Sequence, residues 1–418
     1  MMNVAEEIRS MGEKARAAGR ELAKLGTRKK NAILESMAEA LDEGRGAVKE
    51  ANGRDMEAAR AAGLSDAMMD RLLVTDARLD GMIDGVRKLE ELPDPVGVEM
   101  SRWQRPNGLE IRKVRVPIGV IGMIYESRPN VTVDAAALCF KTSNAVILRG
   151  GREALQSNQA LTEALRRGGE RCGMPSDAVQ LITTTDYAAV TELVRLEGLV
   201  DLVIPRGGEK LIRAVAEQAR VPVIKHYKGI CHVYVDAAAD QEKALAIVEN
   251  AKCSRPGVCN ACEKVLVDRK IAKTFLPKLA ERLGARGVEL RGDEEARAVV
   301  PGMKAATEAD WDEEYLDLVL AVRTVGGAGE AIEWINRHGS HHSDSVVSED
   351  VAVKERFCAE VDSACVYTNA STRFTDGGEF GMGAEIGIST DKLHARGPMG
   401  LEELTTYKYV VTGTGQVR

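Results

Sequence analysis

The sequence predicts an α/β protein made of a doubly wound parallel sheet covered by helices, a second α/β unit and a small separate β element. Three observations lead to this fold class. From Ile118 onward, short apolar runs alternate with amphipathic segments, as in a parallel sheet with helices on both faces. The first hundred residues show helical periodicity instead. Two β-prone stretches, around Asn107-Gly108 and at 405–411, lie outside both patterns.

The N-terminal segment is expected to form amphipathic helices. Thr27 is placed to cap a helix over 27–63, and Ser65 with Asp66 is placed to cap a second one, which ends at the prolines Pro93 and Pro95. After these prolines, Asn107-Gly108 separates two extended, alternating segments, which predicts a β-hairpin over 101–116. The terminal stretch TTYKYVV at 405–411 needs a sheet to join, and this hairpin is its expected partner.

The α/β series begins with the apolar run IGVIGMIYE. Further strands are expected at 145–150, 178–184, 199–208 and 221–227, with helices at 134–144, 152–173, 188–197 and 210–219 between them. A second α/β unit is expected from about Asp240 to Tyr367. We therefore expect a cofactor-binding domain over 1–100 and 117–235, a catalytic domain over 236–370, and a β-flap made of 101–116 and 390–418.

The overall composition excludes several classes of partner. The chain has 418 residues, enough for two or three domains, and a formal net charge of −7. This mild negative charge offers no general attraction to nucleic acid or to an anionic membrane. The N-terminus lacks the apolar core of a signal peptide, and no later stretch is apolar over a membrane-spanning length. We expect a cytoplasmic protein.

Glycine pairs follow two of the predicted strands. Gly150-Gly151 comes after AVILR, and Gly207-Gly208 comes after LVIPR, each directly before a helix. Glycine at such a place lets the backbone approach a phosphate at a helix N-terminus, although glycine pairs also occur in ordinary turns. No G-x-G-x-x-G motif accompanies them.

Three cysteines, Cys253, Cys259 and Cys262, lie within ten positions of each other in AKCSRPGVCNACEKVLV. Such a group could be half of a metal site, part of a disulfide, or one nucleophile with two packed thiols. Disulfides are rare in the cytoplasm, and a zinc site would need a second cysteine pair or nearby histidines. The histidines at 338, 341 and 342 lie about eighty residues away, outside the usual spacing, so no metal is expected.

Cys259 is the best placed of the three to act as a nucleophile. Pro256 and Gly257 interrupt the preceding helix, which leaves Cys259 at a bend whose backbone N–H groups could receive an oxyanion. Arg255 lies close enough in sequence to hold a thiolate or a bound phosphate. A cysteine nucleophile beside a dinucleotide domain suggests a thioester or thiohemiacetal that exchanges a hydride with a nicotinamide.

Several long segments resemble the aldehyde dehydrogenase superfamily, and within it the acyl-phosphate reductases. They are VPIGVIGMIYESRPNVTVDAAALCFKTSNAVILRGGREA, DLVIPRGGEKLI, VIKHYKGICHVYVD, RPGVCNACE, HGSHHSDSVVSED and the tail from NASTRFTDGG to TTYKY. The resemblance implies NADPH-dependent reduction of L-glutamyl 5-phosphate to the 5-semialdehyde with release of phosphate, the second step from glutamate to proline. It also implies an aldehyde dehydrogenase-like fold whose β-flap serves oligomerisation.

The resemblance assigns roles to individual residues. Cys259 falls at the position of the superfamily nucleophile, while Cys253 and Cys262 do not. His226 stands where hydrolytic relatives have a water-activating glutamate, and Ser127-Arg128-Pro129 replaces their asparagine segment. The oxyanion donor is then the Cys259 backbone N–H or the Asn260 side chain. The expected substrate and phosphate residues are Arg128, Arg255 and His226.

The expected cofactor is NADPH, and no metal is expected to take part in the reaction. Arg149 and Arg152 flank the turn where an adenosine ribose would lie, and arginine suits a 2′-phosphate better than a 2′-hydroxyl. Arg152 could equally be a surface charge on the following helix. Glu314 resembles the glutamate that binds the nicotinamide ribose, but could also be a solvated acid before a strand. The expected cofactor residues are Arg149, Gly150, Gly151, Arg152, Arg206, Gly207, Gly208 and Glu314.

The resemblance also bears on partners and rival functions. It implies a homo-oligomer and a transient contact with the glutamate 5-kinase that supplies the labile acyl phosphate. Among enzymes, the rivals are an aldehyde oxidiser, disfavoured by the missing glutamate, and a coenzyme A-dependent reductase, disfavoured by the tail segment. A nucleotide-sensing or scaffolding protein with the same fold would have no use for a reactive Cys259.

Overall fold

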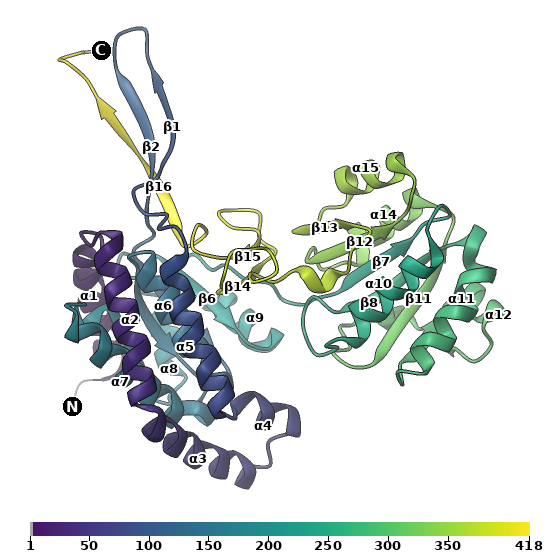
Figure 1. The fold of residues 1–418 in the computed structure, drawn as a ribbon, viewed down its shortest axis with the longest axis horizontal. Coiled ribbons are helices and arrows are strands. Elements are labelled where there is room, and N and C mark those ends of the chain that lie inside the picture. Colours follow the sequence, from purple (N-terminus) through teal and green to yellow (C-terminus); the bar gives the residue numbers. More distant parts are fainter. Residues whose placement is uncertain (1–2) are drawn as a thin grey trace. The chain divides into compact units, whose positions relative to one another are not determined.

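The computed structural model describes residues 3–418, which divide into two compact units. The first unit contains the described residues up to Lys225 together with Gly381–Gly387 and Pro398–Arg418. The second unit contains His226–Phe380 and Ile388–Gly397. Figure 1 shows both units, coloured along the sequence.

The first unit begins with helices, as the sequence predicts, and the structure shows five of them. They are α1 (Val4–Leu22), α2 (Thr27–Glu43), α3 (Arg45–Ala61), α4 (Asp66–Leu72) and α5 (Asp76–Glu91). Ser65 caps α4 as expected, because its side chain accepts a hydrogen bond from the Met68 N–H. The expectation for Thr27 is wrong: Gly26 is the N-cap of α2, and the Thr27 hydroxyl donates to the Asp94 carboxylate instead (3.0 Å). The expected helix over 27–63 is two helices, which meet at Gly44.

A four-stranded parallel sheet forms the core of the first unit. Its order is β5 (Val179–Leu181), β4 (Ala145–Arg149), β3 (Val120–Tyr125) and β6 (Leu202–Arg206). Every residue of β3 is buried, which explains its unbroken apolar sequence. The chain connects these strands through α6 (Pro129–Lys141), α7 (Leu155–Arg171) and α8 (Ala188–Leu193), and α9 (Glu209–Gln218) follows β6. The strand order reverses between β3 and β6, where such sheets bind ligands.

The strand expected at 221–227 does not form. Only an isolated bridge between Val203 and Val223 is present, since Pro222 has no N–H with which to continue a ladder. The next strand, β7 (Cys231–Val235), belongs to the sheet of the second unit. The structural boundary therefore lies between Lys225 and His226, ten positions before the boundary expected at 235/236.

The second unit is a seven-stranded parallel sheet with helices on both faces. Its order is β10 (Lys304–Ala305), β9 (Glu289–Gly292), β11 (Val319–Val325), β8 (Cys262–Asp268), β7, β12 (Ser343–Val347) and β13 (Cys365–Thr368). One face packs on α10 (Gln241–Cys253), α11 (Arg269–Gly284) and α12 (Glu294–Val299) through residues such as Phe275. The other face packs on α14 (Ala328–His338) and α15 (Val351–Glu360) around Tyr234 and Phe357. Short α13 (Glu308–Trp311) precedes β11.

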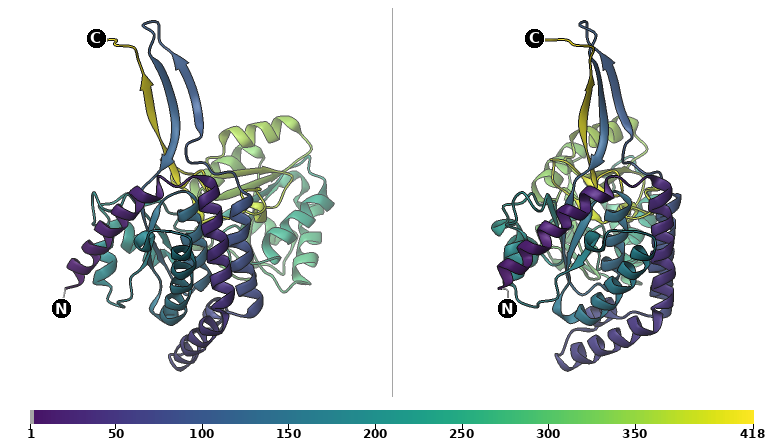
Figure 2. Two further views of the ribbon diagram at one scale, coloured as in Figure 1. Left: turned by 60° about the vertical axis from the view of Figure 1, so that its left-hand side comes forward. Right: turned by 90° about the vertical axis from the view of Figure 1, so that its left-hand side faces the viewer.

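The hairpin and the terminal strand form one three-stranded antiparallel flap in the first unit. Strands β1 (Glu99–Gln104), β2 (Glu110–Pro117) and β16 (Thr405–Thr412) lie in the order β1-β2-β16, which confirms the predicted pairing. Gly108 occupies the turn with φ of 88°, a value that favours glycine. The flap projects from the body of its unit (Figures 1 and 2). Residues 390–404, which the sequence assigned to the flap, are outside it. In this region β15 (Gly397–Met399) pairs with β14 (Gly387–Ser389) in a separate two-stranded sheet.

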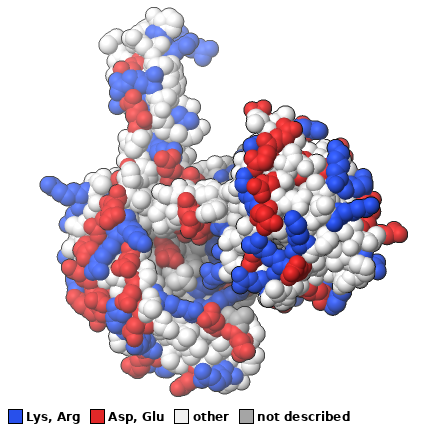
Figure 3. All heavy atoms as spheres, turned by 45° about the vertical axis from the view of Figure 1, so that its right-hand side comes forward, with Lys and Arg blue, Asp and Glu red and all other residues white. Residues whose placement is uncertain are grey.

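The face of the molecule drawn in Figure 3 carries both signs of charge. On the face seen in Figure 3, acidic and basic side chains are interspersed over each unit. This pattern agrees with the small net charge of −7. Among the described residues, no helix has the length and apolar character needed to cross a membrane.

Candidate active site

The cysteine segment lies at the end of the second sheet where its central strands begin. Cys259 precedes β8, His342 precedes β12, and Gly229 precedes β7, and these three strands are neighbours in the sheet. Parallel strands bring their amino ends to one edge, so residues far apart in the sequence meet there. As expected from Pro256 and Gly257, α10 ends at Cys253 and a turn follows.

Close packing holds the backbone around Cys259. The carbonyl oxygen of Cys259 accepts a hydrogen bond from the buried thiol of Cys231 at 3.2 Å. A Cβ atom at Gly229 would lie 1.9 Å from the same oxygen, so only glycine fits against this loop. Among the described residues, the Cys259 N–H makes no hydrogen bond to another backbone group. This N–H can therefore serve as an oxyanion donor.

Two histidines lie beside Cys259. Atoms of His226, Cys259 and His342 that could bind a metal ion all lie within 4.8 Å of one another. The two imidazole rings meet edge to face at 5.4 Å between centroids. Nδ1 of His226 lies 2.8 Å from the carbonyl oxygen of Ile388. The sequence singled out His226 for this place, whereas it set His342 aside as a ligand because of its distance along the chain, and the structure brings it next to Cys259.

The Asn260 side chain is committed to the protein, contrary to its expected role as an oxyanion donor. Its amide nitrogen points to the carbonyl oxygens of Thr375 at 2.8 Å and of Arg373 at 3.5 Å. Its oxygen accepts a hydrogen bond from the Arg373 guanidinium. These contacts tie the cysteine loop to the 3-10 turn η3 (Thr372–Phe374), while the other expected oxyanion donor, the backbone N–H of Cys259, makes no backbone hydrogen bond among the described residues.

Arg373 is a site residue that the sequence reasoning missed. Its Nε donates to the Ser254 hydroxyl at 3.1 Å. Burial lowers the pKa of Arg373, and the nearby positive charge of Arg255 lowers it further, while Cys259 acts in the opposite direction. Arg373 thus interacts electrostatically with both Arg255 and Cys259, and its guanidinium could hold an anion near the thiol. The only sequence signal was a charged residue inside the Gly-rich tail segment.

The other two cysteines of the segment are packed thiols, as the sequence predicts. Cys262 is fully buried and donates to the Lys264 carbonyl oxygen at 3.2 Å, and burial raises the pKa of its thiol to about 12. Cys253 packs against the core, and burial followed by the charge of Glu249 raises the pKa of its thiol. Raised pKa values leave less thiolate at neutral pH, so both groups are poor nucleophiles.

Most of the expected cofactor residues lie together in the first unit, at the carboxyl ends of its strands. Arg149 with Gly150-Gly151 ends β4, and Arg206 with Gly207-Gly208 ends β6. The Arg149 guanidinium donates to the Gly150 carbonyl oxygen at 2.8 Å, and burial lowers its pKa. Its buried Nε has no hydrogen-bond partner among the described residues. Arg152 is exposed at the start of the 3-10 turn η1 (Arg152–Ala154), and Arg128 is the N-cap of α6.

The glycines at these strand ends are explained by packing. A Cβ at Gly150 would lie 2.1 Å from Nδ2 of Asn158, and one at Gly207 would lie 2.5 Å from a carboxylate oxygen of Glu126. The same Glu126 carboxylate accepts a hydrogen bond from the Gly208 N–H at 2.8 Å. Glu126, at the end of β3, therefore organises the start of α9.

Glu314 belongs to the second unit, whereas the other expected cofactor residues belong to the first. Its carboxylate accepts a hydrogen bond from the Gly229 N–H at 2.9 Å. Since Gly229 packs on the Cys259 carbonyl oxygen, Glu314 is one contact away from the cysteine loop.

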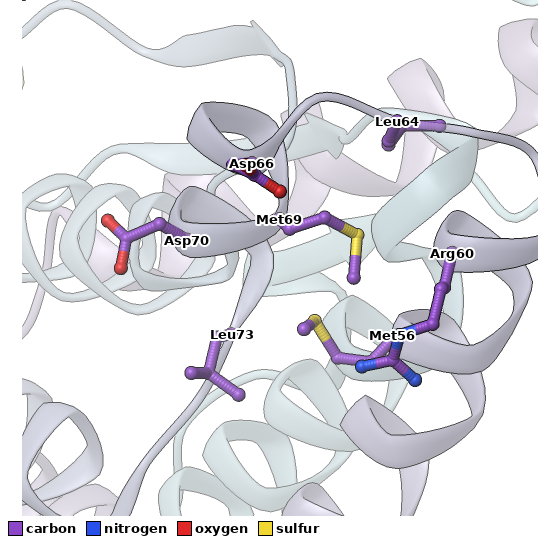
Figure 4. Close-up of a pocket in the computed structure, with 7 residues that line it drawn as sticks. All are labelled: Met56, Arg60, Leu64, Asp66, Met69, Asp70 and Leu73. Carbon is purple, nitrogen blue, oxygen red and sulfur yellow. The ribbon is translucent and has the colours of Figure 1, made fainter.

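A cavity of about 290 Å³ lies elsewhere in the first unit, between α3 and α4 (Figure 4). It is lined by Met56, Arg60, Leu64, Asp66, Met69, Asp70 and Leu73. None of the expected site residues is among them, so this cavity is separate from the chemistry described above.

Comparisons with known proteins give a consistent result. Residues 2–300 match the model of the aldehyde dehydrogenase family. The chain is 57% identical over 417 residues to the γ-glutamyl phosphate reductase of Moorella thermoacetica, with 100% of both chains covered. It is 53% identical to the same enzyme of Aquifex aeolicus, with 97% of this chain and 95% of that protein covered. The crystal structure of the Thermotoga maritima enzyme superimposes with a TM-score of 0.97 at 49% identity, covering 99% and 100% of the two chains.

Proposed function

Because the chain belongs to the aldehyde dehydrogenase family, and within it to the γ-glutamyl phosphate reductases, we propose that Cys259 is the nucleophile of a phosphate-releasing reductase. The activity is the reduction of L-glutamyl 5-phosphate to L-glutamate 5-semialdehyde, the second step of proline biosynthesis. The observation that carries the catalytic assignment is that the Cys259 thiol lies within 4.8 Å of ring nitrogens of two histidines and interacts electrostatically with the Arg373 guanidinium.

The first chemical step is acyl transfer to sulfur. The Cys259 thiolate attacks the 5-carbonyl carbon, and the Cys259 N–H receives the negative charge that develops on the carbonyl oxygen. The bond from this carbon to the phosphate oxygen then breaks, and phosphate leaves with its electron pair. Arg255 and Arg373 bind the departing phosphate, which needs no proton from a general acid. The product of this step is a thioester on Cys259.

The second step is reduction of that thioester, for which NADPH supplies a hydride when bound. The buried Nε of Arg149, which has no hydrogen-bond partner among the described residues, suits the 2′-phosphate that NADPH has and NADH lacks. The exposed Arg152 follows three positions later in the sequence. These two side chains would hold the 2′-phosphate, and Arg206 with the strand-end glycines would bind the rest of the dinucleotide. Glu314 would bind the nicotinamide ribose. The reduced carbon then expels the Cys259 sulfur as the aldehyde forms.

The thioester must survive until it is reduced. His226 stands where hydrolytic relatives place the glutamate that activates water. Its Nδ1 faces a backbone carbonyl oxygen, which holds the ring in one orientation beside Cys259. We assign His226, with Arg128, to substrate and phosphate binding. The enzyme would act in the cytoplasm as a homo-oligomer, and would receive its labile substrate from glutamate 5-kinase.

The reverse reaction tests this function most directly. Purified protein given glutamate 5-semialdehyde should reduce NADP only when inorganic phosphate is present, because phosphate must cleave the thioester. An aldehyde oxidiser would reduce NADP without phosphate, and a coenzyme A-dependent enzyme would require the thiol cofactor instead. Either result would refute the proposal, as would the complete inactivity expected of a scaffold protein.

A further inference from the structure

We propose that Cys259, His226 and His342 form a reversible zinc site that switches the enzyme off by capping its nucleophile. The inhibitory effect rests on the proposed role of Cys259, whereas metal binding itself does not. The candidate ligand atoms lie within 4.8 Å of one another and belong to the residue types that zinc prefers. Neither the family nor the reaction calls for a metal at this place.

The distances are compatible with a single bound ion. With zinc–sulfur bonds of about 2.3 Å and zinc–nitrogen bonds of about 2.0–2.1 Å, the ligand atoms of a tetrahedral site lie roughly 3.5 Å apart. Closing the cluster therefore requires side-chain shifts of roughly 1 Å. His226 and Cys259 are only partly buried and can supply this movement, while the fully buried His342 stays in place.

Contacts around the histidines resemble those that orient metal ligands. Histidine ligands usually donate their second ring N–H to an oxygen of the protein. Nδ1 of His226 lies 2.8 Å from the Ile388 carbonyl oxygen, so its Nε2 carries the lone pair. Nδ1 of His342 lies 2.9 Å from the Ser343 hydroxyl, which in turn contacts the Thr375 hydroxyl at 2.6 Å.

Two features make the site weaker than a structural zinc centre. The described residues offer three ligands to this site, so water would fill the fourth position. The positive charges of Arg255 and Arg373 also repel a zinc ion. Binding replaces the thiol proton of Cys259 by a zinc–sulfur bond and releases that proton to solvent, without any redox change. Substrate that acylates Cys259 would compete with this state, because its acyl carbon occupies the same sulfur.

The first test is inhibition of the full-length enzyme. Free Zn²⁺ in the micromolar range should abolish turnover, and EDTA should restore it. His226→Asn should raise the half-inhibitory zinc concentration about 10- to 100-fold, measured against the variant's own uninhibited rate. Cys358→Ser is the control, because this exposed thiol is not one of the three candidate ligands and its loss should leave inhibition unchanged. Equal sensitivity of wild type and His226→Asn would overturn the site.

The second test reads metal binding without turnover. Co²⁺ added to the wild-type protein in the absence of substrate should produce a thiolate-to-cobalt charge-transfer band, and Zn²⁺ should remove it. Cys259→Ser should lose this band. A band that persists in Cys259→Ser, or no band in wild type, would overturn the zinc site whether or not the proposed reaction holds. Zn²⁺ should also protect one fast-reacting thiol of the wild-type protein from iodoacetamide, and a lack of protection would count against the proposal.

Discussion

At the scale of single residues, the three clustered cysteines differ in their surroundings more than in their sequence. Cys262 is buried at the start of a central strand, and Cys253 packs on the core. Cys259 lies just before the same central strand, beside two imidazoles. The sequence predicted that Cys259 follows a turn, because Pro256 and Gly257 interrupt the helix, but Cys259 is only partly buried, as Cys253 is, and not exposed. The sequence could not predict Arg373 or His342, whose side chains reach the thiol only through tertiary folding.

Cys259→Ser should therefore abolish reduction in both directions, by at least about a thousandfold in kcat, since no other thiolate can form the acyl intermediate. Cys253→Ala and Cys262→Ala should keep most activity, and the buried Cys262 should cost about 1 kcal/mol of stability. Steady-state kinetics with circular dichroism as a folding control provides the measurement. A dead Cys262→Ala enzyme with native circular dichroism would show that the wrong cysteine was assigned.

Neutral replacements of Arg149 or Arg152 should raise KM for NADPH far more than KM for NADH. Losing a charge-assisted hydrogen bond to phosphate costs about 1.5–3 kcal/mol, which is about a 10- to 150-fold change in affinity. Arg149→Gln and Arg152→Gln can be compared with Arg195→Gln, which alters an exposed arginine near Gln218 instead. Equal losses for both cofactors would rule out the 2′-phosphate contact.

At the scale of secondary-structure elements, the site is unusual for a parallel sheet. Ligands of such sheets normally sit at the carboxyl ends of strands, and the expected dinucleotide residues follow that rule. The cysteine site instead lies at the amino ends of β7, β8 and β12. The positions of its side chains therefore depend on how tightly the segments before these strands pack on each other.

Gly229→Ala tests this packing. The added methyl group would collide with the Cys259 carbonyl oxygen, so the nucleophile loop must shift. A displacement of about 1 Å can cost about a hundredfold in kcat. The matched control is Gly257→Ala, whose Cβ would lie 3.7 Å from the Leu316 carbonyl oxygen, an ordinary contact. Similar kcat values for the two variants would show that the loop is not held by Gly229.

Helix α5 offers a test of pH dependence. Burial, followed by the neighbouring Glu35, raises the pKa of Glu90 from its usual 4.5 to about 7. Between these two values the unfolded chain has released the proton that the folded protein retains, so rising pH favours unfolding. Wild type should thus lose about 1 kcal/mol more than Glu90→Gln between pH 5 and pH 8, after allowance for solvent screening. Parallel plots of thermal midpoint against pH for the two proteins would contradict this assignment.

At the scale of the whole molecule, the sequence predicted the fold class and the partners of the flap, and it missed the boundary between the units. The apolar runs and the Asn107-Gly108 turn are local signals, and they identified strands correctly. The stretch VPVIKHY carried the same apolar signal but contains Pro222, and it forms no strand. Which sheet a strand joins depends on pairing with distant segments, so β7 could not be assigned from its own residues.

Deleting residues from Thr405 onward should give monomers or aggregates in which the cofactor sheet remains folded. Strand β16 pairs with β2 along its whole length, and the flap exposes Trp103, Tyr407, Tyr409 and Val411. A two-stranded ribbon is marginal in water, so the truncated flap would lose both its third strand and its contact surface. Deleting only the residues after Thr412 keeps β16 and is the control. An oligomer of unchanged size in the longer truncation, seen by light scattering, would exclude the flap as the interface.

The pairing of β2 with β16 also has a consequence for the protein as it leaves the ribosome. Pro117 pairs with Thr405, 288 positions later in the chain. At about 5–20 residues per second, the hairpin waits roughly 15–60 s with an unpaired, β-prone edge before its final strand is synthesised. An open edge of this kind recruits other strands, so nascent chains on one messenger could pair wrongly with each other. Slower translation over the last third of the message should therefore lower the yield of native protein, while chaperones that shield strand edges should restore it.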